Sequence, residues 1–313
     1  GLGDVYKRQR PRCWTTCSKR DPPSTISGTF TNRRRFRGSW GTPSVGTLAT
    51  SAPPARRCAT NRDPAAGGPP RREVDLAALA EGYRHRPPSA GSLSHAARAA
   101  DSVGLQPGDW ALDAGGGPGA HAAVWANGGA AAVVLDASPA MAQIAASRRG
   151  VVATVGRTQQ MPFRDGRFSL VYFHLSIHYG DWRAALGEAQ RVLRIGGRCW
   201  VWTLGAIHHR ASFLARWFPS VGEIDAVRFP DPAEIADVLA QRFGDVTQGT
   251  TVEVVERRAG SWVEAVRGGF VSTLQMVSPQ ELESGIAAFA RYYPDPDDIV
   301  EYQMRWDWLS AQR

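Results

Sequence analysis

Apolar runs and helix-like stretches alternate along the middle of the chain. The continuous apolar runs are typical of strands buried on both faces of a sheet, and they lie at 110–114, 131–136, 150–155, 167–174 and 198–204. The stretches between them carry apolar residues three or four positions apart, which predicts amphipathic helices. Strands that alternate with helices in this way form a parallel sheet with helices on both faces.

Capping residues mark the ends of two of these helices. Ser138 followed by Pro139 predicts the start of one helix, because serine caps a helix and proline suits its first turn. Asp181 predicts the start of the next helix by the same capping chemistry. The two glycines at 196–197 predict where that second helix ends.

Two later helices also carry start signals. Asp231 with Glu234, and Ser278 with Glu281, have the spacing of a capping box, in which the first side chain caps the helix and the glutamate reaches back. We therefore expect helices to begin at both places.

The outer parts of the chain complete the predicted fold. Amphipathic helices are expected at 75–83 and 92–105, and a sixth strand at 250–256. Strict alternation of apolar and polar residues over 300–308 predicts a half-exposed, antiparallel seventh strand. The predicted fold class is α/β: a doubly wound, Rossmann-like, seven-stranded and mostly parallel sheet with an antiparallel last strand and helices on both faces.

Charge divides the chain into two parts. Residues 1–72 hold 15 Lys/Arg and 3 Asp/Glu, a net of +12, which leaves 22 basic and 26 acidic residues, a net of −4, in 73–313. The first part lacks a periodic apolar pattern, and its opening resembles a translated sequencing adapter, so we expect a disordered, non-native segment. We expect 73–313 to be one domain without a second core, with a helical lid or insert at about 206–222 and a helical insert at about 260–296.

Cysteines and apolar segments bear on location. Of the four cysteines, only Cys199 lies beyond residue 72, so no disulfide framework or zinc site is indicated. No window has the length of a membrane span and no signal peptide is apparent. These features favour a cytoplasmic protein without a membrane partner.

The glycine-rich stretch 113–120 fits two kinds of cofactor. Gly115, Gly117 and Ala120 match the G-x-G-x-x-G/A loop of dinucleotide-binding units, and Asp136 follows at the distance of a ribose-binding acid. Asp113, however, stands at the strand tip immediately before the loop. Its carboxylate would repel a pyrophosphate, whereas it suits the ammonium group of S-adenosylmethionine (SAM).

Four segments of the chain resemble class I SAM-dependent methyltransferases. They are "LDAGGGPG", "VVLDASPAM", "MPFRDGRFSLVYFHLSIHYGDWRAAL" and "EAQRVLRIGG", in the order and spacing of the family, and the resemblance covers about residues 75–257. It is strongest to the ubiquinone/menaquinone C-methyltransferase-like, methyltransferase type 11 group. It implies transfer of a methyl group from SAM to a small-molecule acceptor at an oxygen, nitrogen or carbon atom.

The resemblance also assigns roles to particular residues. The loop glycines would lie under the methionine part of SAM, Asp113 would face that part, and Asp136 would accept hydrogen bonds from both ribose hydroxyls. The remaining implied cofactor contacts are Gly115, Gly117, Gly119, Ala137, Ser138, Met141, Arg157, Thr158, His174 and Tyr83. Arg157 stands where the family usually has an aspartate that accepts from the adenine amino group, and arginine has no acceptor. The contact with the adenine amino group is therefore expected from Thr158, Gln159 or a main-chain carbonyl, or is absent.

Histidines after the fourth predicted strand are the candidate catalytic residues. We predict His178 as a base that removes a proton from the acceptor, and His174 as a second candidate that borders SAM. A hydrogen-bonded structural role is the alternative for His178. No metal site is predicted. His208 and His209 either reach the site from the lid segment or begin a solvated helix.

Three other functions fit parts of the sequence. A methyltransferase acting on a tRNA or RNA base fits the "SIHYGDW" stretch, but the acidic balance of 73–313 argues against nucleic acid, whose phosphates need clustered Lys/Arg. A catalytically weak, methyltransferase-like binding protein fits the departure at Arg157. An NAD-dependent oxidoreductase fits the glycine loop alone.

Overall fold

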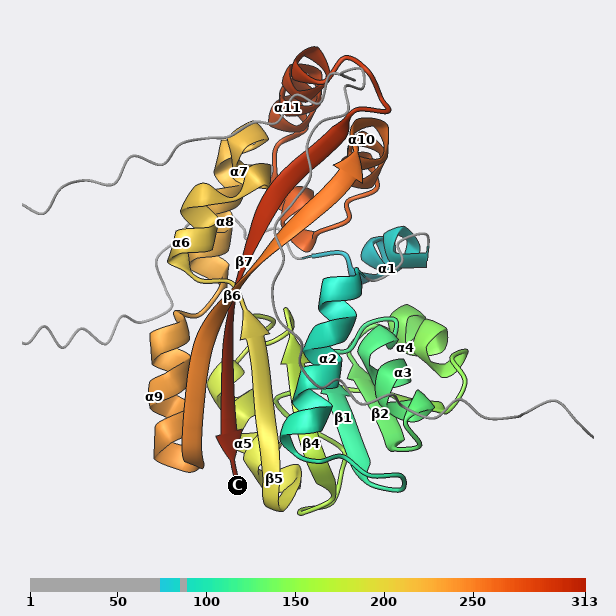
Figure 1. Ribbon diagram of the computed structural model, residues 1–313, viewed down its shortest axis with the longest axis vertical. Coiled ribbons are helices and arrows are strands. Elements are labelled where there is room, and N and C mark those ends of the chain that lie inside the picture. The colour runs from blue at the N-terminus through green and yellow to red at the C-terminus, as the bar shows by residue number, and fades with distance from the viewer. Residues whose placement is uncertain (1–73, 85–88) are drawn as a thin grey trace, which may run out of the picture. The chain divides into compact units, whose positions relative to one another are not determined.

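A computed structural model describes residues 74–84 and 89–313 of the chain, and Figure 1 shows their arrangement. All of the described residues fall in one compact unit, Gly67–Arg313. The predicted disordered, non-native segment 1–72 lies outside the described residues.

A seven-stranded sheet forms the centre of this unit. Its strand order is β3-β2-β1-β4-β5-β7-β6. Strands β1 to β5 pair in parallel, and β7 pairs antiparallel with β5 and β6. This is the predicted fold class. The strands are β1 (Trp110–Ala114), β2 (Ala131–Asp136), β3 (Val151–Val155), β4 (Phe168–His174), β5 (Leu193–Thr203), β6 (Gly244–Arg258) and β7 (Ile299–Gln312).

Helices cover both faces of the sheet. One face packs on α5 (Trp182–Val192) and α9 (Pro232–Arg242), around a core that includes Leu112, Phe168 and Leu186. The other face packs on α2 (Ala90–Ser102), α3 (Ala120–Asn127) and α4 (Pro139–Ala146), with Trp125 and Trp202 in its core. The tryptophans of β5 and β7 thus fill space between layers.

The strand order reverses direction between β1 and β4. The chain passes from β1 to β2 and β3 on one side, and then returns to β4 on the other side of β1. In doubly wound folds, ligands bind in the crevice beyond the carboxyl ends of the strands at this reversal. The site is therefore expected where β1 and β4 end.

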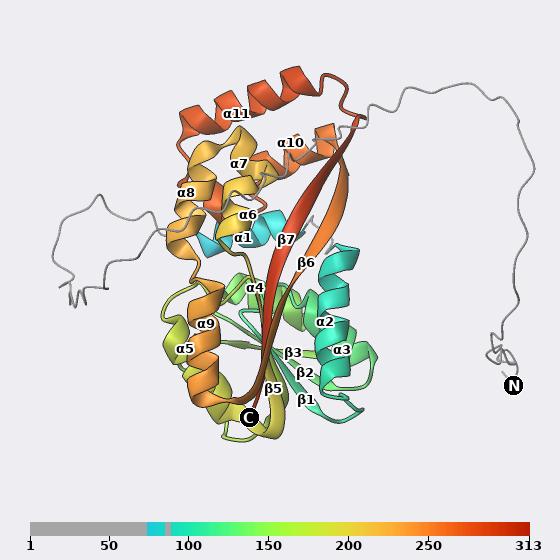
Figure 2. The same cartoon turned by 60° about the vertical axis from the view of Figure 1, so that its left-hand side comes forward.

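Strands β6 and β7 extend past the rest of the sheet and carry a helical cap (Figure 2). The cap consists of α6 (Ala206–Ala211), α7 (Phe213–Trp217), α8 (Pro219–Arg228), α10 (Ala259–Arg267), the 3-10 helix η1 (Ser272–Met276) and α11 (Pro279–Tyr292). Phe218, Trp262 and Phe289 form the centre of a separate apolar cluster in the cap. The expectation of a single core is therefore wrong, because the insert helices bury their apolar faces against one another.

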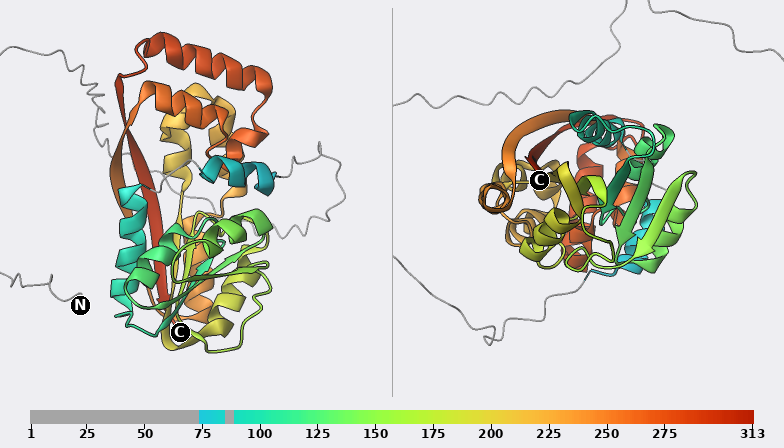
Figure 3. Two further views of the ribbon diagram at one scale, coloured as in Figure 1. Left: turned by 90° about the vertical axis from the view of Figure 1, so that its right-hand side faces the viewer. Right: turned by 90° about the horizontal axis from the view of Figure 1, so that it is seen from below.

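Helix α1 (Leu76–Arg84) lies between the cap and the sheet (Figure 3). Leu79 and Ala80 pack on Met141 of α4. The backbone amide of Asp75 donates to the side chain of Gln275 in η1, at 2.8 Å. Helix α1 thus joins the cap to the part of the sheet beside the glycine loop.

Two of the predicted helix boundaries are confirmed and one is wrong. Ser138 caps α4, accepting from the amide of Met141, and Asp181 caps α5. Helix α5 ends at Val192, however, before the two glycines at 196–197, which lie inside β5. The chain passes directly from α5 into β5, where Gly196 has a φ of +77° at an irregularity of the strand pairing. A left-handed glycine serves a strand bulge as well as a helix end.

In both predicted capping boxes the first residue caps its helix, but the glutamates bond elsewhere, and Glu281 accepts from the amide of Ser220 at 2.9 Å. Asp231 accepts from the amide of Ala233 at the start of α9, and Ser278 accepts from the amide of Glu281 at the start of α11. Glu234 bonds with Arg183 of α5 at 3.0 Å. The capping side chains therefore start both helices as predicted.

Candidate active site

The loop between β1 and α3 passes very close to its neighbours. Gly115, Gly117 and Gly119 all have positive φ, at 71°, 53° and 74°. A Cβ atom on Gly115 would lie 2.6 Å from Cβ of Ser176, and one on Gly119 would lie 2.9 Å from Cβ of Ala145. At Gly117 the nearest atom would be the Met141 sulfur at 3.8 Å, so the middle of the loop is open on one side.

Asp136 ties this loop to the turn after β2. Its Oδ2 accepts from the amide of Gly117 at 2.8 Å, and its Oδ1 accepts from the amide of Ser138 at 2.9 Å. Burial raises the pKa of this carboxyl, while the two amide hydrogen bonds oppose the rise. A carboxylate has about four lone-pair positions, so two amides leave capacity for hydroxyl donors.

Asp113, at the end of β1, is buried without a hydrogen-bond donor. Its side chain is 1% exposed, and neither carboxylate oxygen has a hydrogen-bond partner among the described residues. The nearest ring nitrogen is Nδ1 of His121, 3.7 Å from Oδ2. The loop packs directly against the carboxylate, since a Cβ on Gly116 would lie 2.4 Å from its Cγ. A buried charge without a partner is costly, so this geometry favours a cationic ligand.

The carboxyl end of β4 is fixed against β1 and β5 by main-chain contacts. Leu175, directly after the strand, has a φ of +50°, which is unfavourable for a residue with a Cβ. Its amide donates to the carbonyl of Trp202 at 3.0 Å. The Ser176 hydroxyl donates to the carbonyl of Ala114 at 2.6 Å. These two hydrogen bonds hold Leu175 in its unfavourable conformation and keep Ser176 at the end of β1.

Three of the expected cofactor contacts, Ala137, Met141 and Tyr83, lie on three different elements. Ala137 is exposed in the turn after β2, whereas Met141 is buried under α1. Tyr83 of α1 is half-buried and packs in the same cluster as Met141. The structure thus brings Met141 and Tyr83 together, with the Met141 sulfur facing Gly117 of the loop.

Arg157 and Thr158 lie in a short turn after β3. Arg157 is exposed and Thr158 is half-buried, and the turn closes through a bridge between residues 157 and 160. Gln159 donates from its side-chain nitrogen to the carbonyl of Tyr179 at 2.8 Å. The turn is thereby anchored to the segment that follows β4.

His178 is enclosed by aromatic and cationic groups. Its ring stacks on Phe229 with centroids 3.9 Å apart, and neither ring nitrogen has a hydrogen-bond partner among the described residues. Burial, reinforced by the nearby Arg228 and His209, lowers its pKa well below the usual histidine value. His178 is therefore neutral at neutral pH, and its burial makes it a weaker base than an ordinary histidine.

His208 and His209 lie in α6 and are buried, 7% and 4% exposed. The alternative of a solvated helix start is therefore wrong. The ring of His209 lies 5.1 Å from that of Phe229, which places it on the same aromatic group as His178. Helix α6 thus lies beside the segment that follows β4, where His178 is located.

The structure shows neither a metal-binding cluster nor a membrane helix in the part of the chain that it describes. No group of three or more metal-ligating side chains comes together in 74–84 and 89–313. Within the same ranges, no helix is both long and apolar enough to cross a bilayer.

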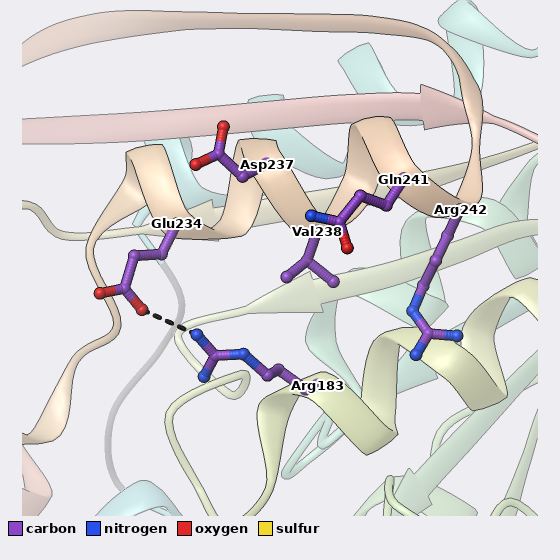
Figure 4. Close-up of a pocket in the computed structure, with 6 residues that line it drawn as sticks. All are labelled: Arg183, Glu234, Asp237, Val238, Gln241 and Arg242. Carbon is purple, nitrogen blue, oxygen red and sulfur yellow. Dashed lines mark hydrogen bonds and ion pairs between the residues drawn. The ribbon is translucent and has the colours of Figure 1, made fainter. Parts of the chain in front are cut away.

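A separate cleft of about 310 Å³ lies between α5 and α9 (Figure 4). It contains no residue of the glycine loop or of the strand ends. Its Arg183–Glu234 ion pair spans 3.0 Å, with both side chains more than half exposed. An open, polar groove of this kind gives no support to a catalytic role. Its lining residues are Arg183, Glu234, Asp237, Val238, Gln241 and Arg242.

Sequence reasoning missed three side chains beside the predicted site. His174 Nε2 lies 3.2 Å from Nδ1 of His95 in α2, and the His174 ring lies 4.4 Å from that of His121 in α3. His95 in turn lies 2.8 Å from the carboxylate of Glu253 in β6. His95 and Glu253 come from distant parts of the chain, so no spacing pattern connects them to the loop, whereas His121 directly follows the glycine-rich stretch 113–120.

Comparison with known proteins agrees with this geometry. Residues 112–201 match a family described as a methyltransferase domain. A malonyl-[acyl-carrier protein] O-methyltransferase of Herminiimonas arsenicoxydans is 32% identical over 174 residues, which are 54% of this chain and 62% of that protein. The protein of the same name from Serratia marcescens is 33% identical over 102 residues, 32% of this chain and 40% of the relative. The chain spans less than two thirds of the length of both relatives.

Solved structures share the fold. A putative methyltransferase from an antibiotic biosynthesis pathway of Anabaena variabilis is 19% identical, with a TM-score of 0.58 over 71% of this chain and 97% of that one. The YcgJ protein of Bacillus subtilis is 16% identical, with a TM-score of 0.51 over 70% and 98% of the two chains. The matched methyltransferase domain, residues 112–201, contains the glycine loop and runs from β1 into β5 of the seven-stranded sheet.

Proposed function

We propose that the chain transfers a methyl group from SAM to a small-molecule acceptor. The observation that carries this proposal is the buried Asp113 carboxylate, which has no hydrogen-bond donor among the described residues and touches the glycine loop. The ammonium of SAM would supply a hydrogen-bond donor and a positive charge to this carboxylate. The pyrophosphate of NAD would add negative charge beside it.

The residues around the loop fit the rest of SAM. Asp136 keeps lone pairs for the ribose hydroxyls after accepting from Gly117 and Ser138. Ala137, Ser138, Met141 and Tyr83 would border the adenine on one side. The turn with Arg157 and Thr158 would border it on the other, with acceptors from Thr158 or the main chain.

We place the acceptor between the end of β4 and the helical cap. His178, Tyr179 and Arg228 lie together there. The guanidinium carbon of Arg228 is 5.7 Å from the centre of the Tyr179 ring, and the rings of His178 and Tyr179 are 4.2 Å apart. The sulfonium of SAM supplies an activated methyl group, so the protein has mainly to align the acceptor and exclude water. Neutral His178 would take the proton that an O–H, N–H or acidic C–H acceptor loses.

The names of the two relatives favour an oxygen atom as the acceptor. Both are O-methyltransferases that by name act on malonyl-[acyl-carrier protein]. For this chain we propose an acceptor oxygen on a small molecule that is either linked to an acyl carrier or free. We also infer a cytoplasmic protein without a nucleic-acid partner, which the acidic balance of 73–313 and the free, buried thiol of Cys199 support.

Calorimetry with S-adenosylhomocysteine (SAH), SAM and NAD tests the cofactor. We expect the full chain to bind SAH and SAM but not NAD. Asp136→Ala should weaken SAH about 10- to 100-fold, because charge-assisted bonds to hydroxyls contribute roughly 1.5–3 kcal/mol. Asp101→Ala, at the exposed end of α2, is the matched control and should leave the affinity unchanged.

Two outcomes would contradict this proposal. Unchanged SAH affinity in Asp136→Ala would remove the ribose assignment, and binding of NAD alone would favour an oxidoreductase. A chain that binds SAH but shows no methyl transfer to a panel of acyl, hydroxyl and amine acceptors would favour the binding protein without turnover.

A further inference from the structure

The segment between β4 and α5, residues 175–181, carries the side chains that we place beside the acceptor. The His178 ring stacks on Phe229, with centroids 3.9 Å apart, and the guanidinium carbon of Arg228 lies 5.7 Å from the centre of the Tyr179 ring. Arg228 ends α8 and Phe229 follows it, so these contacts come from the helical cap. We call residues 175–181 the acceptor loop.

Gln159 reaches the acceptor loop from the turn after β3. Its side-chain nitrogen donates to the main-chain carbonyl of Tyr179 at 2.8 Å. A carbonyl oxygen can only accept, so the side-chain amide must present its NH₂ group to the loop. Hydrogen-bond chemistry therefore fixes which end of the Gln159 amide faces the acceptor loop.

The backbone of the acceptor loop leaves room for this amide. Gly180 has a φ of +86°, a conformation that favours glycine. A Cβ atom on Gly180 would also collide with Nε2 of Gln159 and lie 3.1 Å from its Cδ. The Gln159 amide thus lies directly against the backbone of residues 179–180, and contact and hydrogen bond agree.

The next part of the same turn is fixed to α5 instead. The amide of Met161 donates to Oε2 of Glu188 at 2.6 Å, and Arg191 donates from Nη2 to the carbonyl of Met161 at 2.9 Å. Gln159 precedes this anchored part and directly follows residues 157–158, which are expected to border the cofactor. A shift of residues 157–158 can therefore reach the acceptor loop through Gln159 while Met161 stays in place.

We propose that Gln159 is a positioning residue that holds the acceptor loop and transmits cofactor binding from the turn after β3 to His178 and Tyr179. This inference rests on the proposed function, in which residues 157–158 border the adenine. Gln159 itself touches neither the methyl group nor the acceptor. Its hydrogen bond keeps the loop in one conformation, which matters because methyl transfer depends on the alignment of the reacting atoms.

Two substitutions separate the hydrogen bond from the size of the side chain. Gln159→Met has a similar length but no donor, whereas Gln159→Lys keeps an N–H donor. Gln160→Met, at the exposed neighbour in the same turn, is the matched control. Gln159→Met should speed hydrogen exchange in the acceptor loop roughly 2- to 10-fold, the effect of losing one hydrogen bond, and Gln159→Lys should restore the slower exchange.

Deuterium uptake of the full chain, with and without SAH, measures the transmission. In the unmutated chain, SAH should slow exchange both in the glycine loop and in the acceptor loop. In Gln159→Met, SAH should still protect the glycine loop but should protect the acceptor loop much less. A merely structural role would change exchange in the acceptor loop equally with and without SAH. Calorimetry should give an SAH affinity close to that of the unmutated chain, because Gln159 contacts the loop and not the cofactor.

Several results would overturn the proposal. One is equal SAH-dependent protection of the acceptor loop in Gln159→Met and the unmutated chain, or no such protection in either. Another is the same loss of protection in Gln160→Met. A third is a loss of SAH affinity in Gln159→Met as large as that expected for Asp136→Ala, which would make Gln159 a cofactor contact. Failure of the proposed function is distinct, because a chain that does not bind SAH would show no protection of the glycine loop in any variant.

Discussion

Single buried histidines make the stability of the fold depend on pH. Burial lowers the pKa of His208 from 6.5 to about 4. Between these values the unfolded chain binds a proton that the folded chain does not bind, so stability falls as the pH drops through this window. The Nδ1 of His208 accepts from the amide of Arg305 at 3.4 Å, and an asparagine amide oxygen can replace it.

His208→Asn should therefore reduce the loss of stability in acid. Urea unfolding at pH 7.5 and pH 4.5 should give a difference in unfolding free energy that is about 2–3 kcal/mol smaller than in the unmutated chain. An equal difference in both chains would show that His208 titrates normally in the folded state.

At this scale the sequence reveals residues that lie close together along the chain. Asp113 and the loop glycines are consecutive, and Asp136 follows after a single helix and strand, so a linear pattern contains them. His95 and Glu253 are 158 positions apart, because the first lies in α2 and the second in β6. The packing of α2 on the sheet and the pairing of β6 with β7 bring them together, and no local propensity encodes either contact.

At the scale of elements, helix starts follow from the sequence more reliably than helix ends. Asp181 accepts from the amides of Arg183 and Ala184, both at 3.0 Å, as a capping residue should. The end of the same helix was mispredicted, because Gly196 has the left-handed backbone of a helix end but serves the irregular start of β5. A side-chain cap acts locally, whereas a glycine only permits a conformation that several structures use.

Removal of this cap should have a measurable cost. Asp181→Ala leaves two amides of α5 without their acceptor and should lower the unfolding free energy by about 1 kcal/mol. Urea unfolding at pH 7 measures this, with Glu256→Ala as an exposed control on β6. A variant as stable as the control would mean that water replaces the cap at no cost.

For the whole molecule, the sequence predicts the layered sheet but not the second core. The sheet is predicted by continuous apolar runs that alternate with amphipathic helices, a pattern common to doubly wound proteins. The cap helices are short, and their apolar residues meet partners from other helices, as Trp262 of α10 meets Phe289 of α11 with ring centroids 4.0 Å apart. Such contacts depend on how the helices are arranged in the folded protein. The apolar pattern within one helix therefore does not predict which other helix it packs against.

The separate core implies that the cap can loosen while the sheet keeps its structure. Trp262 is 1% exposed and belongs to the cap cluster, whereas Trp125 is 2% exposed and belongs to the core beneath α2 and α3. Loss of either ring should cost about 3–5 kcal/mol. Trp262→Ala should speed hydrogen exchange in α7, α8, α10 and α11 and leave β1, β4 and SAH affinity unchanged.

Trp125→Ala is the contrasting variant, because it removes packing directly under the helix that follows the glycine loop. It should weaken SAH and speed exchange in β1 and β2 as well as in α3. Mass spectrometry of deuterium uptake, read peptide by peptide, distinguishes the two patterns. If Trp262→Ala weakened SAH as much as Trp125→Ala does, the cap and the sheet would unfold as one cooperative unit, and the acceptor side of the site could not move independently of the cofactor side.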